Sequence, residues 1–324
     1  MKILGAVTCI IFLLQQPQTI KVDVGLREVA VSVRNAQGEF VPGLKASDFI
    51  VDEDGIPQSI VHFASQDSPT PVSFAVLIDN RTRFPIDNDA DRYRAGVEGD
   101  NPAFFAAMVG TSDLIARLKP GDEVALMSYS DELKVEQNFT SSAEALEMRL
   151  RQMKPSQRRN GLARTFTTLD AMNPALNVMK KAKWPRRVLI VFSAWFNEYQ
   201  PMDSKESKRI EEQVARAGTA IFGFGIEGEG VPPPGILGSR TGDTKLGQAL
   251  RLLSSESGGL TRMYGLMTPD QRTIRASEFV RTVLSDQSGQ YVIGYYPADS
   301  PGAKHVARVR AISPEYRVQF VSAP

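Results

Sequence analysis

The sequence predicts an α/β fold, a doubly wound and mostly parallel sheet that is inserted in a small all-β domain. Three observations lead to this prediction. The chain has 324 residues, which is long enough for two domains. Strand and helix patterns alternate from about residue 72 to residue 287, as expected of a parallel sheet with helices on both faces. Patterns of short strands without helices stand on either side of this region, at the two ends of the chain.

The chain begins with the pattern of a signal peptide. Lys2 precedes an uncharged, largely apolar run from Ile3 to Leu14, which is too short to cross a bilayer as a helix. A buried N-terminal strand or helix is the alternative. We expect residues 1–18 to be removed on export, so that the mature protein is periplasmic or secreted and has no membrane span. Cys9 is the only cysteine, so the mature chain would hold no thiol for disulfides, catalysis or metal binding.

A β region follows the signal pattern. Residues 22–35 alternate apolar and polar side chains, which is typical of a half-buried strand. Asp54-Gly55 followed by Pro57 indicates a hairpin turn between two further short strands, because glycine accepts a positive φ and proline removes a hydrogen-bond donor. Residues 64–71 have the composition of a linker.

The pattern changes after this linker. The run Val72 to Asp79 is apolar almost throughout, as in a strand that is covered on both faces. Ser142 is a suitable N-cap for one of the helices that follow. We predict strands at 72–79, 122–130, 133–140, 186–194, 219–226 and 260–264, and helices at 101–118, 141–153, 167–182, 204–218, 244–259 and 268–287.

Strand patterns without helices return at the C-terminal end. Each end of the chain alone offers few strands, and such small β units are marginal in water. We therefore predict that residues 19–68 and 289–324 form one discontinuous β-sandwich-like domain, with residues 70–288 inserted between them. Two separate β appendages are the alternative. The closing strands are predicted at 289–297, 304–312 and 315–322.

The composition excludes some classes of partner. With 42% hydrophobic and 23% charged residues, the chain has the composition of an ordinary globular protein. Its formal net charge of +1 lacks the basic excess that is typical of proteins that bind nucleic acids or anionic membranes. We therefore expect no nucleic acid, and the charge gives no clue to the protein partner, whose identity is unknown.

Three segments could form a site at the edge of the sheet. In doubly wound sheets, ligands lie beyond the carboxyl ends of the strands. The first segment is Asp79 with the residues after it, the second runs from Gly161 to Met172, and the third is Ser193-Ala194.

These three segments, in this order, resemble the von Willebrand factor type A domain, whose fold is Rossmann-like. The flanking segments resemble those of a related family of exported bacterial proteins, with Asn35 where that family's pattern has an aspartate. The matching positions are Gly38, Val41, Leu44, Asp48, Phe49, Val51, Glu53, Asp54 and Gly55 before the α/β region, and Tyr291, Ile293, Gly294, Tyr295, Tyr296 and Pro297 after it.

The resemblance implies a metal-ion-dependent adhesion site. In such a site one carboxylate and two hydroxyls of the first loop, a threonine of the second and an aspartate of the third hold Mg²⁺, which prefers octahedral oxygen ligands. This chain keeps Asp79 but has Arg81 and Arg83 at the hydroxyl positions, and Ala194 stands where the third loop has its aspartate. An arginine repels a divalent cation and cannot lose its charge. We therefore expect a degenerate site with neither metal nor other cofactor.

If a metal did bind, Asp79 with Thr167 or Thr168 would hold it. Two alternatives are open for the arginines. One of them takes the place of the cation, paired with Asp79, and its fork binds a carboxylate of the partner. Otherwise both are solvated and Asp79 caps a turn, which we favour because loop charges are usually solvated. The residues of the candidate binding edge are Asp79, Arg81, Arg83, Thr165, Thr167, Thr168, Ser193 and Trp195.

Other motifs are weaker. Asp87 to Asp91 with Glu98 has the spacing of a calcium loop, but Arg92 stands where that loop requires glycine, so a solvated acidic loop is favoured. The glycines from Gly223 to Gly230 run into prolines and indicate a loop. His62 and His305 are the only histidines; no Ser-His-Asp arrangement can be proposed from them, and a two-histidine catalytic or zinc site is an alternative without support.

The function that we expect is that of an exported, non-enzymatic protein-binding module of the adhesion type, independent of metal. One alternative is a structural scaffold in a bacterial envelope assembly, with the β-domain as its working part. A second is a hydrolase whose site the sequence does not reveal. Fold does not determine function, so the adhesion interpretation rests on the resemblance.

Overall fold

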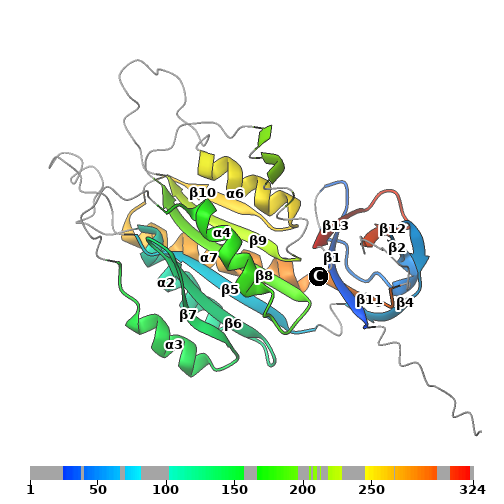
Figure 1. Ribbon diagram of the computed structural model, residues 1–324, viewed down its shortest axis with the longest axis horizontal. Coiled ribbons are helices and arrows are strands. Elements are labelled where there is room, and N and C mark those ends of the chain that lie inside the picture. The colour runs from blue at the N-terminus through cyan, green and yellow to red at the C-terminus, as the bar shows by residue number, and fades with distance from the viewer. Residues whose placement is uncertain are drawn as a thin grey trace, which may run out of the picture.

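The computed structural model describes residues 25–37, 40–65, 70–81, 102–156, 166–195, 218–227, 245–265, 267–297 and 307–321, together with residues 204–205, 207–209 and 212. These residues form two lobes (Figure 1). The larger lobe is an α/β sandwich, and the smaller contains only strands and one short 3-10 helix. The predicted signal peptide, residues 1–18, lies outside the described residues.

The α/β lobe is built on one sheet of six strands, in the order β10-β9-β8-β5-β6-β7. All neighbours are parallel except β6 and β7, so the predicted mostly parallel α/β fold is confirmed. Every residue of β5 is buried, as its apolar run predicts. The strands are β5 (Val72–Asp79), β6 (Glu123–Tyr129), β7 (Leu133–Thr140), β8 (Arg186–Trp195), β9 (Ala220–Glu227) and β10 (Thr261–Tyr264).

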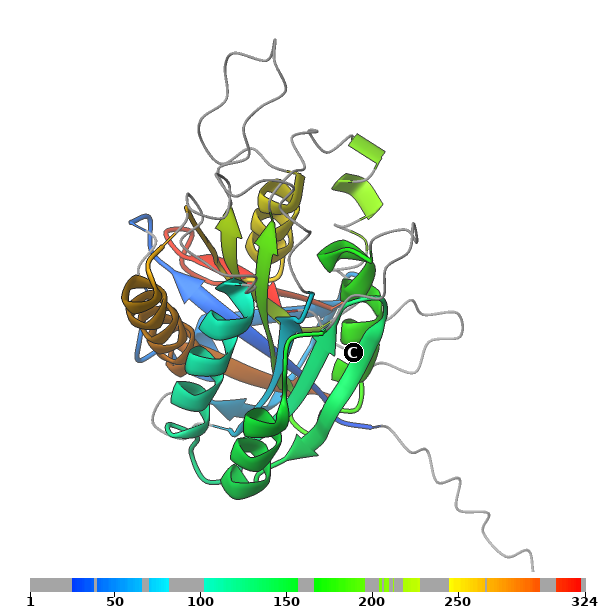
Figure 2. The same cartoon turned by 90° about the vertical axis from the view of Figure 1, so that its left-hand side faces the viewer.

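Helices cover both faces of this sheet (Figures 1 and 2). On one face α2 (Pro102–Ile115), α3 (Ala143–Gln152) and α7 (Pro269–Ser288) share a core with the side chains of Phe74, Val76 and Ile78. On the other face α4 (Thr168–Met179) and α6 (Lys245–Glu256) share a second core with Ala75 and Leu77. Alternate residues of β5 thus serve two cores, which is the physical reason for its continuous apolar sequence.

The helix ends follow local capping rules. The Ser142 hydroxyl accepts a hydrogen bond from the amide of Ala145 at 3.1 Å, so its predicted N-cap role in α3 is confirmed. The helix predicted at 101–118 ends at Ile115, where a tight connection leads into β6. Only parts of the helix predicted at 204–218 lie within the described residues.

The β lobe combines strands from both ends of the chain. Its sheets have the orders β13-β1-β11-β4 and β12-β2-β3, and all their pairs are antiparallel. Asp54 and Gly55 both have positive φ, of 50° and 83°, in the turn between β2 and β3, as the predicted hairpin requires. The strands are β1 (Arg27–Arg34), β2 (Phe49–Glu53), β3 (Ile56–Gln58), β4 (Ile60–Ala64), β11 (Gln290–Tyr295), β12 (Ala307–Ala311) and β13 (Arg317–Val321), with the 3-10 helix η1 at Ala46–Asp48.

The two lobes are joined where α7 runs into β11. Every residue of β11 is buried. One face of its sheet, β13-β1-β11-β4, packs on the core of the β lobe, and the other face lies toward the α/β lobe, whose core includes Ala30 of β1. Arg34 of β1 forms an ion pair with Asp286 of α7 at 2.7 Å. This pair links β1 to the helix directly. The domain boundaries predicted near residues 69 and 289 stay predictions.

No helix among the described residues combines the length and the apolar character that a membrane crossing requires.

Candidate functional site

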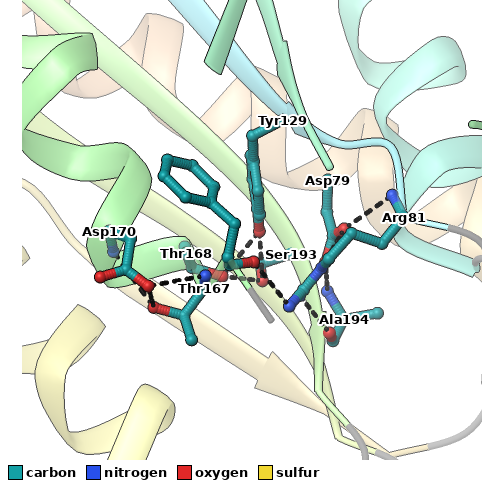
Figure 3. Close-up of polar contacts among 9 residues, drawn as sticks. Asp79, Arg81, Tyr129, Thr167, Thr168, Asp170, Ser193 and Ala194 are labelled. Carbon is teal, nitrogen blue, oxygen red and sulfur yellow. Dashed lines mark hydrogen bonds and ion pairs between the residues drawn. The ribbon is translucent and has the colours of Figure 1, made fainter. Parts of the chain in front are cut away.

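The candidate site lies at the carboxyl edge, by which we mean the edge of the α/β sheet where its parallel strands end. Because β5 lies between β6 and β8, the last residue of β5, Asp79, stands beside Tyr129 of β6 and close to the end of β8. The first turn of α4 reaches the same place. Figure 3 shows the side chains of Asp79, Arg81, Tyr129 and Ser193 converging there. The three segments proposed from the sequence therefore meet in space.

Asp79 and Arg81 form a bidentate ion pair. The Nε of Arg81 donates to Oδ1 of Asp79 at 2.8 Å, and Nη2 donates to Oδ2 at 2.6 Å. The Asp79 side chain is 1% exposed and that of Arg81 is 15% exposed. The preferred expectation that Arg81 is solvated is therefore wrong. A buried carboxylate needs a counter-charge, and the guanidinium two residues further along the chain reaches back to supply it.

Backbone amides complete the coordination of the carboxylate. The amide of Arg81 donates to Oδ1 at 3.1 Å, and the amide of Ala194 donates to Oδ2 at 3.2 Å. Asp79 therefore accepts two hydrogen bonds on each oxygen. This is close to the full acceptor capacity of a carboxylate.

The remaining donors of Arg81 point inward as well. Nη1 donates to the carbonyl of Phe166 at 3.4 Å, and Nη2 donates to the carbonyl of Ala194 at 3.3 Å. The guanidinium carbon lies 5.3 Å from the centre of the Tyr129 ring. The alternative in which an arginine replaces the cation and pairs with Asp79 agrees with this geometry. The fork, however, is directed at groups of the chain itself and not at a carboxylate of a partner.

Three buried hydroxyls form a closed triangle at the same edge (Figure 3). The Tyr129 hydroxyl lies 2.6 Å from that of Thr168 and 3.1 Å from that of Ser193, and the latter two are 2.6 Å apart. Burial, and then the charge of Asp79, raise the pKa of the Tyr129 phenol above its usual value. This shift favours the protonated phenol.

The other predicted residues are placed as follows. The Thr167 hydroxyl caps α4 and hydrogen-bonds with Asp170, at 2.8 Å to its carboxylate and 3.1 Å to its amide, so it is engaged away from Asp79. Trp195 is the last residue of β8, and its side chain is outside the described part of the chain. Arg83 and Thr165 lie outside the described residues, as do His305, the acidic stretch from Asp87 to Glu98 and the glycines after Glu227.

Tyr129 is the residue that the sequence analysis missed. Its signal was available in part, because it ends a strand of the parallel sheet and all such strands end at one edge. What could not be known was that β6 is the direct neighbour of β5, which brings Tyr129 opposite Asp79.

The residues at this edge do not fit a divalent metal. Asp79 is already satisfied by four donors, two of them N–H groups of the charged Arg81 guanidinium, and Ala194 supplies no carboxylate. Both Thr167 and Thr168 direct their hydroxyls to other partners. Within the described ranges, no group of three or more histidine, cysteine, aspartate or glutamate side chains could hold a metal ion elsewhere. These groups form an internal ion pair and do not offer the free oxygen ligands that Mg²⁺ requires.

Comparison with known protein families gives a match to part of the α/β lobe. The family model of the von Willebrand factor type A domain matches residues 96–195. The chain therefore contains a von Willebrand factor type A domain. The match begins after Asp79 and includes β6, α4 and β8. No curated protein matches the chain.

Several solved structures match this chain at low identity. The protein BatB from Bacteroides thetaiotaomicron is 13% identical with a TM-score of 0.40, and the similarity covers 67% of this chain and 99% of that chain. An aerotolerance-related membrane protein from Bacteroides fragilis is 12% identical with a TM-score of 0.38, covering 65% and 99%. A von Willebrand factor type A protein from Catenulispora acidiphila is 9% identical with a TM-score of 0.42, covering 92% and 72%. With identities of 13% or less and TM-scores below 0.5, we draw no conclusion about this chain from these matches.

Proposed function

We propose that this chain, with its von Willebrand factor type A domain, is an exported, non-enzymatic protein-binding module of the adhesion type that engages its partner without a divalent metal. The observation that carries the proposal is the saturated Asp79 carboxylate. A metal-dependent edge needs this carboxylate as a ligand, and here Arg81 holds both of its oxygens. Partner binding at this edge then depends on the shape and hydrogen bonding of the folded chain.

The absence of catalysis is supported by the chemistry of the edge. Among the described residues its hydroxyls have no free base beside them, since Asp79 is paired with Arg81 and the pKa of Tyr129 is raised. His62 lies in the β lobe, 3.4 Å from Glu28, and hydrogen-bonds with none of these hydroxyls. Export is supported by the signal-peptide pattern of residues 1–18.

A direct experiment tests metal independence. The mature chain, without residues 1–18, is immobilised and used to capture proteins from a bacterial envelope fraction with EDTA, with added Mg²⁺ and with neither. We expect the same captured protein in the same amount under all three conditions. Calorimetric titration of the purified chain with Mn²⁺ should give no binding heat above that of dilution. Capture that EDTA abolishes, together with stoichiometric Mn²⁺ binding, would contradict the proposal.

A scaffold role of the β lobe is the second candidate, and one observation favours it. A groove of about 370 Å³ is lined by residues of η1, β2 and β3 and by Ile60. Nearby, the large apolar side chains of Ile56 in β3 and Val61 in β4 are 47% and 52% exposed. If the β lobe is the working part, Ile56→Lys should abolish capture while Arg81→Ala leaves it intact. The reverse result favours binding at the carboxyl edge.

A further inference from the structure

Arg81 connects three segments that are far apart in the sequence. Its guanidinium holds the Asp79 carboxylate at the end of β5, the carbonyl of Phe166 just before α4, and the carbonyl of Ala194 near the end of β8. The two carbonyls belong to residues 85 and 113 positions further along the chain. One side chain therefore ties together the three segments that form the carboxyl edge.

Backbone hydrogen bonds also hold the chain around Arg81 in place. The amide of Asn80 donates to the carbonyl of Tyr129 at 2.9 Å, and the amide of Ser156 donates to the carbonyl of Asn80 at 2.9 Å. Arg81 also forms an isolated parallel bridge with Ser156. The turn is thus anchored to β6 and to the segment after α3. Its guanidinium starts from a fixed position, so less side-chain entropy is lost when the hydrogen bonds form.

The chemistry of the contacts requires a planar cation with several donors. Two carboxylate oxygens and two carbonyl oxygens surround the guanidinium, and all four are acceptors. A lysine ammonium is a compact point charge that does not reproduce the planar fork of arginine. On its other side the guanidinium faces the ring of Tyr129.

From these observations we propose that Arg81 is a built-in cation of the carboxyl edge. It is a positioning residue: it neutralises Asp79, cross-links the ends of β5 and β8 to the start of α4, and keeps the edge in one arrangement at all metal concentrations. The inference rests on the proposed function, because it explains how a binding edge without a metal keeps its shape. It concerns the regulation of that edge, which is always assembled and is not switched by ions.

The experiment compares Arg81→Ala with Arg310→Ala in the full mature chain. Arg310 is the matched control, because it pairs with Asp52 at 2.9 Å but is itself 62% exposed and joins only two adjacent strands. We expect Arg81→Ala to lower the folding equilibrium constant about 100-fold or more, and Arg310→Ala to lower it less than about fivefold. Equal effects of the two substitutions would overturn the proposal.

Chemical rescue separates a built-in cation from ordinary packing. Guanidinium ion, added well below denaturing concentrations, should raise the melting temperature of Arg81→Ala. The melting temperature of the wild type should stay the same or fall. Hydrogen exchange should show faster exchange of the amides of residues 166–170 and 192–194 in Arg81→Ala, and guanidinium should slow it again. If the melting temperature and the exchange rates do not respond to guanidinium, Arg81 has only a packing role. Arg81→Lys should recover less than half of the lost stability.

A double variant keeps the test decisive if Arg81→Ala does not fold. In Asp79→Asn with Arg81→Met no buried charge is left unpaired, so this variant should be more stable than Arg81→Met alone. If it is not, charge compensation is not the role of Arg81. None of these measurements needs a partner. Failure of the proposed function would appear instead as capture by the wild type that EDTA abolishes.

Discussion

The ion pair between the lobes allows a quantitative prediction. Arg34 of β1 donates from Nη2 to Oδ1 of Asp286 at 2.7 Å, and its guanidinium also lies 4.0 Å from the centre of the Phe40 ring. The Asp286 side chain is 5% exposed. Within the described part of the chain, its second oxygen has no hydrogen-bond donor. Replacing Arg34 by methionine keeps most of the apolar stem and leaves this carboxylate buried without a counter-charge.

The magnitude follows from the burial of the pair. Removing one partner of a fully buried ion pair costs about 3–5 kcal/mol. Arg34 is 24% exposed, and the carboxyl group can escape the penalty by taking up a proton. We therefore expect Arg34→Met to lower the free energy of unfolding by about 2–3 kcal/mol at neutral pH. Asp286→Asn, which removes the charge itself, should cost about 1 kcal/mol, and the double variant little more than that.

The pH dependence has a definite sign. Burial raises the pKa of Asp286 above its usual value, and Arg34 opposes this rise. In Arg34→Met the folded-state pKa rises further. A carboxyl group whose folded pKa is raised favours the folded state most below its unfolded pKa, about 3.9, and this stabilisation is lost as the pH rises through the folded pKa. The deficit of Arg34→Met should therefore shrink as the pH is lowered toward 3.9.

Urea-induced unfolding monitored by circular dichroism, at neutral and mildly acidic pH, measures all three variants. Tryptophan fluorescence adds a probe of the α/β lobe, where Trp184 donates from Nε1 to the carbonyl of Gly121 at 2.8 Å. A second transition in Arg34→Met would indicate that the lobes unfold separately once the pair is lost. Strictly additive effects of the two single substitutions, or a deficit that grows on acidification, would refute the reasoning.

Three further predictions concern single side chains of the α/β lobe. Burial opposes ionisation of Glu136, but hydrogen bonds from Ser128, Lys134 and Arg149 lower its pKa. The stability that its charge supplies is thus present above the unfolded pKa and lost as the pH falls through the lower folded pKa. Melting temperatures should therefore differ between the wild type and Glu136→Gln at neutral pH and converge in acid, and a constant difference would exclude this explanation. Thr168→Val removes one member of the hydroxyl triangle and should cost about 1–3 kcal/mol in urea unfolding, whereas no loss would mean that the triangle does not contribute to stability. Ser142→Ala should cost about 1 kcal/mol by the same assay, and an unchanged midpoint would argue against the cap of α3.

The sequence patterns located most elements of the fold because those elements have local causes. The apolar run of β5, the positive-φ turn at Asp54-Gly55 and the cap at Ser142 each depend on residues within one or two turns of chain. The predicted ends of helices and strands were less accurate than their positions. The helix α2 stops at Ile115, three residues before its expected end.

The candidate site could be predicted only in part. Asp79 was recognisable, since it follows a buried strand of a parallel sheet and matches the first position of a known motif. The state of Arg81 was not, because a loop arginine is solvated unless a buried carboxylate lies within its reach. Whether Asp79 is buried depends on β6 and β8, which cover it from both sides.

The sequence by itself determined that the central region is a parallel α/β sheet and that strands stand at both ends, and it showed Arg81 and Ala194 at positions where the resembling motif has oxygen ligands. Only the tertiary structure decided that β1 lies between β11 and β13, that Tyr129 stands beside Asp79, and that the fork of Arg81 turns inward. The physical reason is the distance along the chain over which each interaction acts. Periodicity and capping act over a few residues, whereas strand order and burial result from many weak contacts between distant segments, and these contacts determine the environment in which a charge is placed.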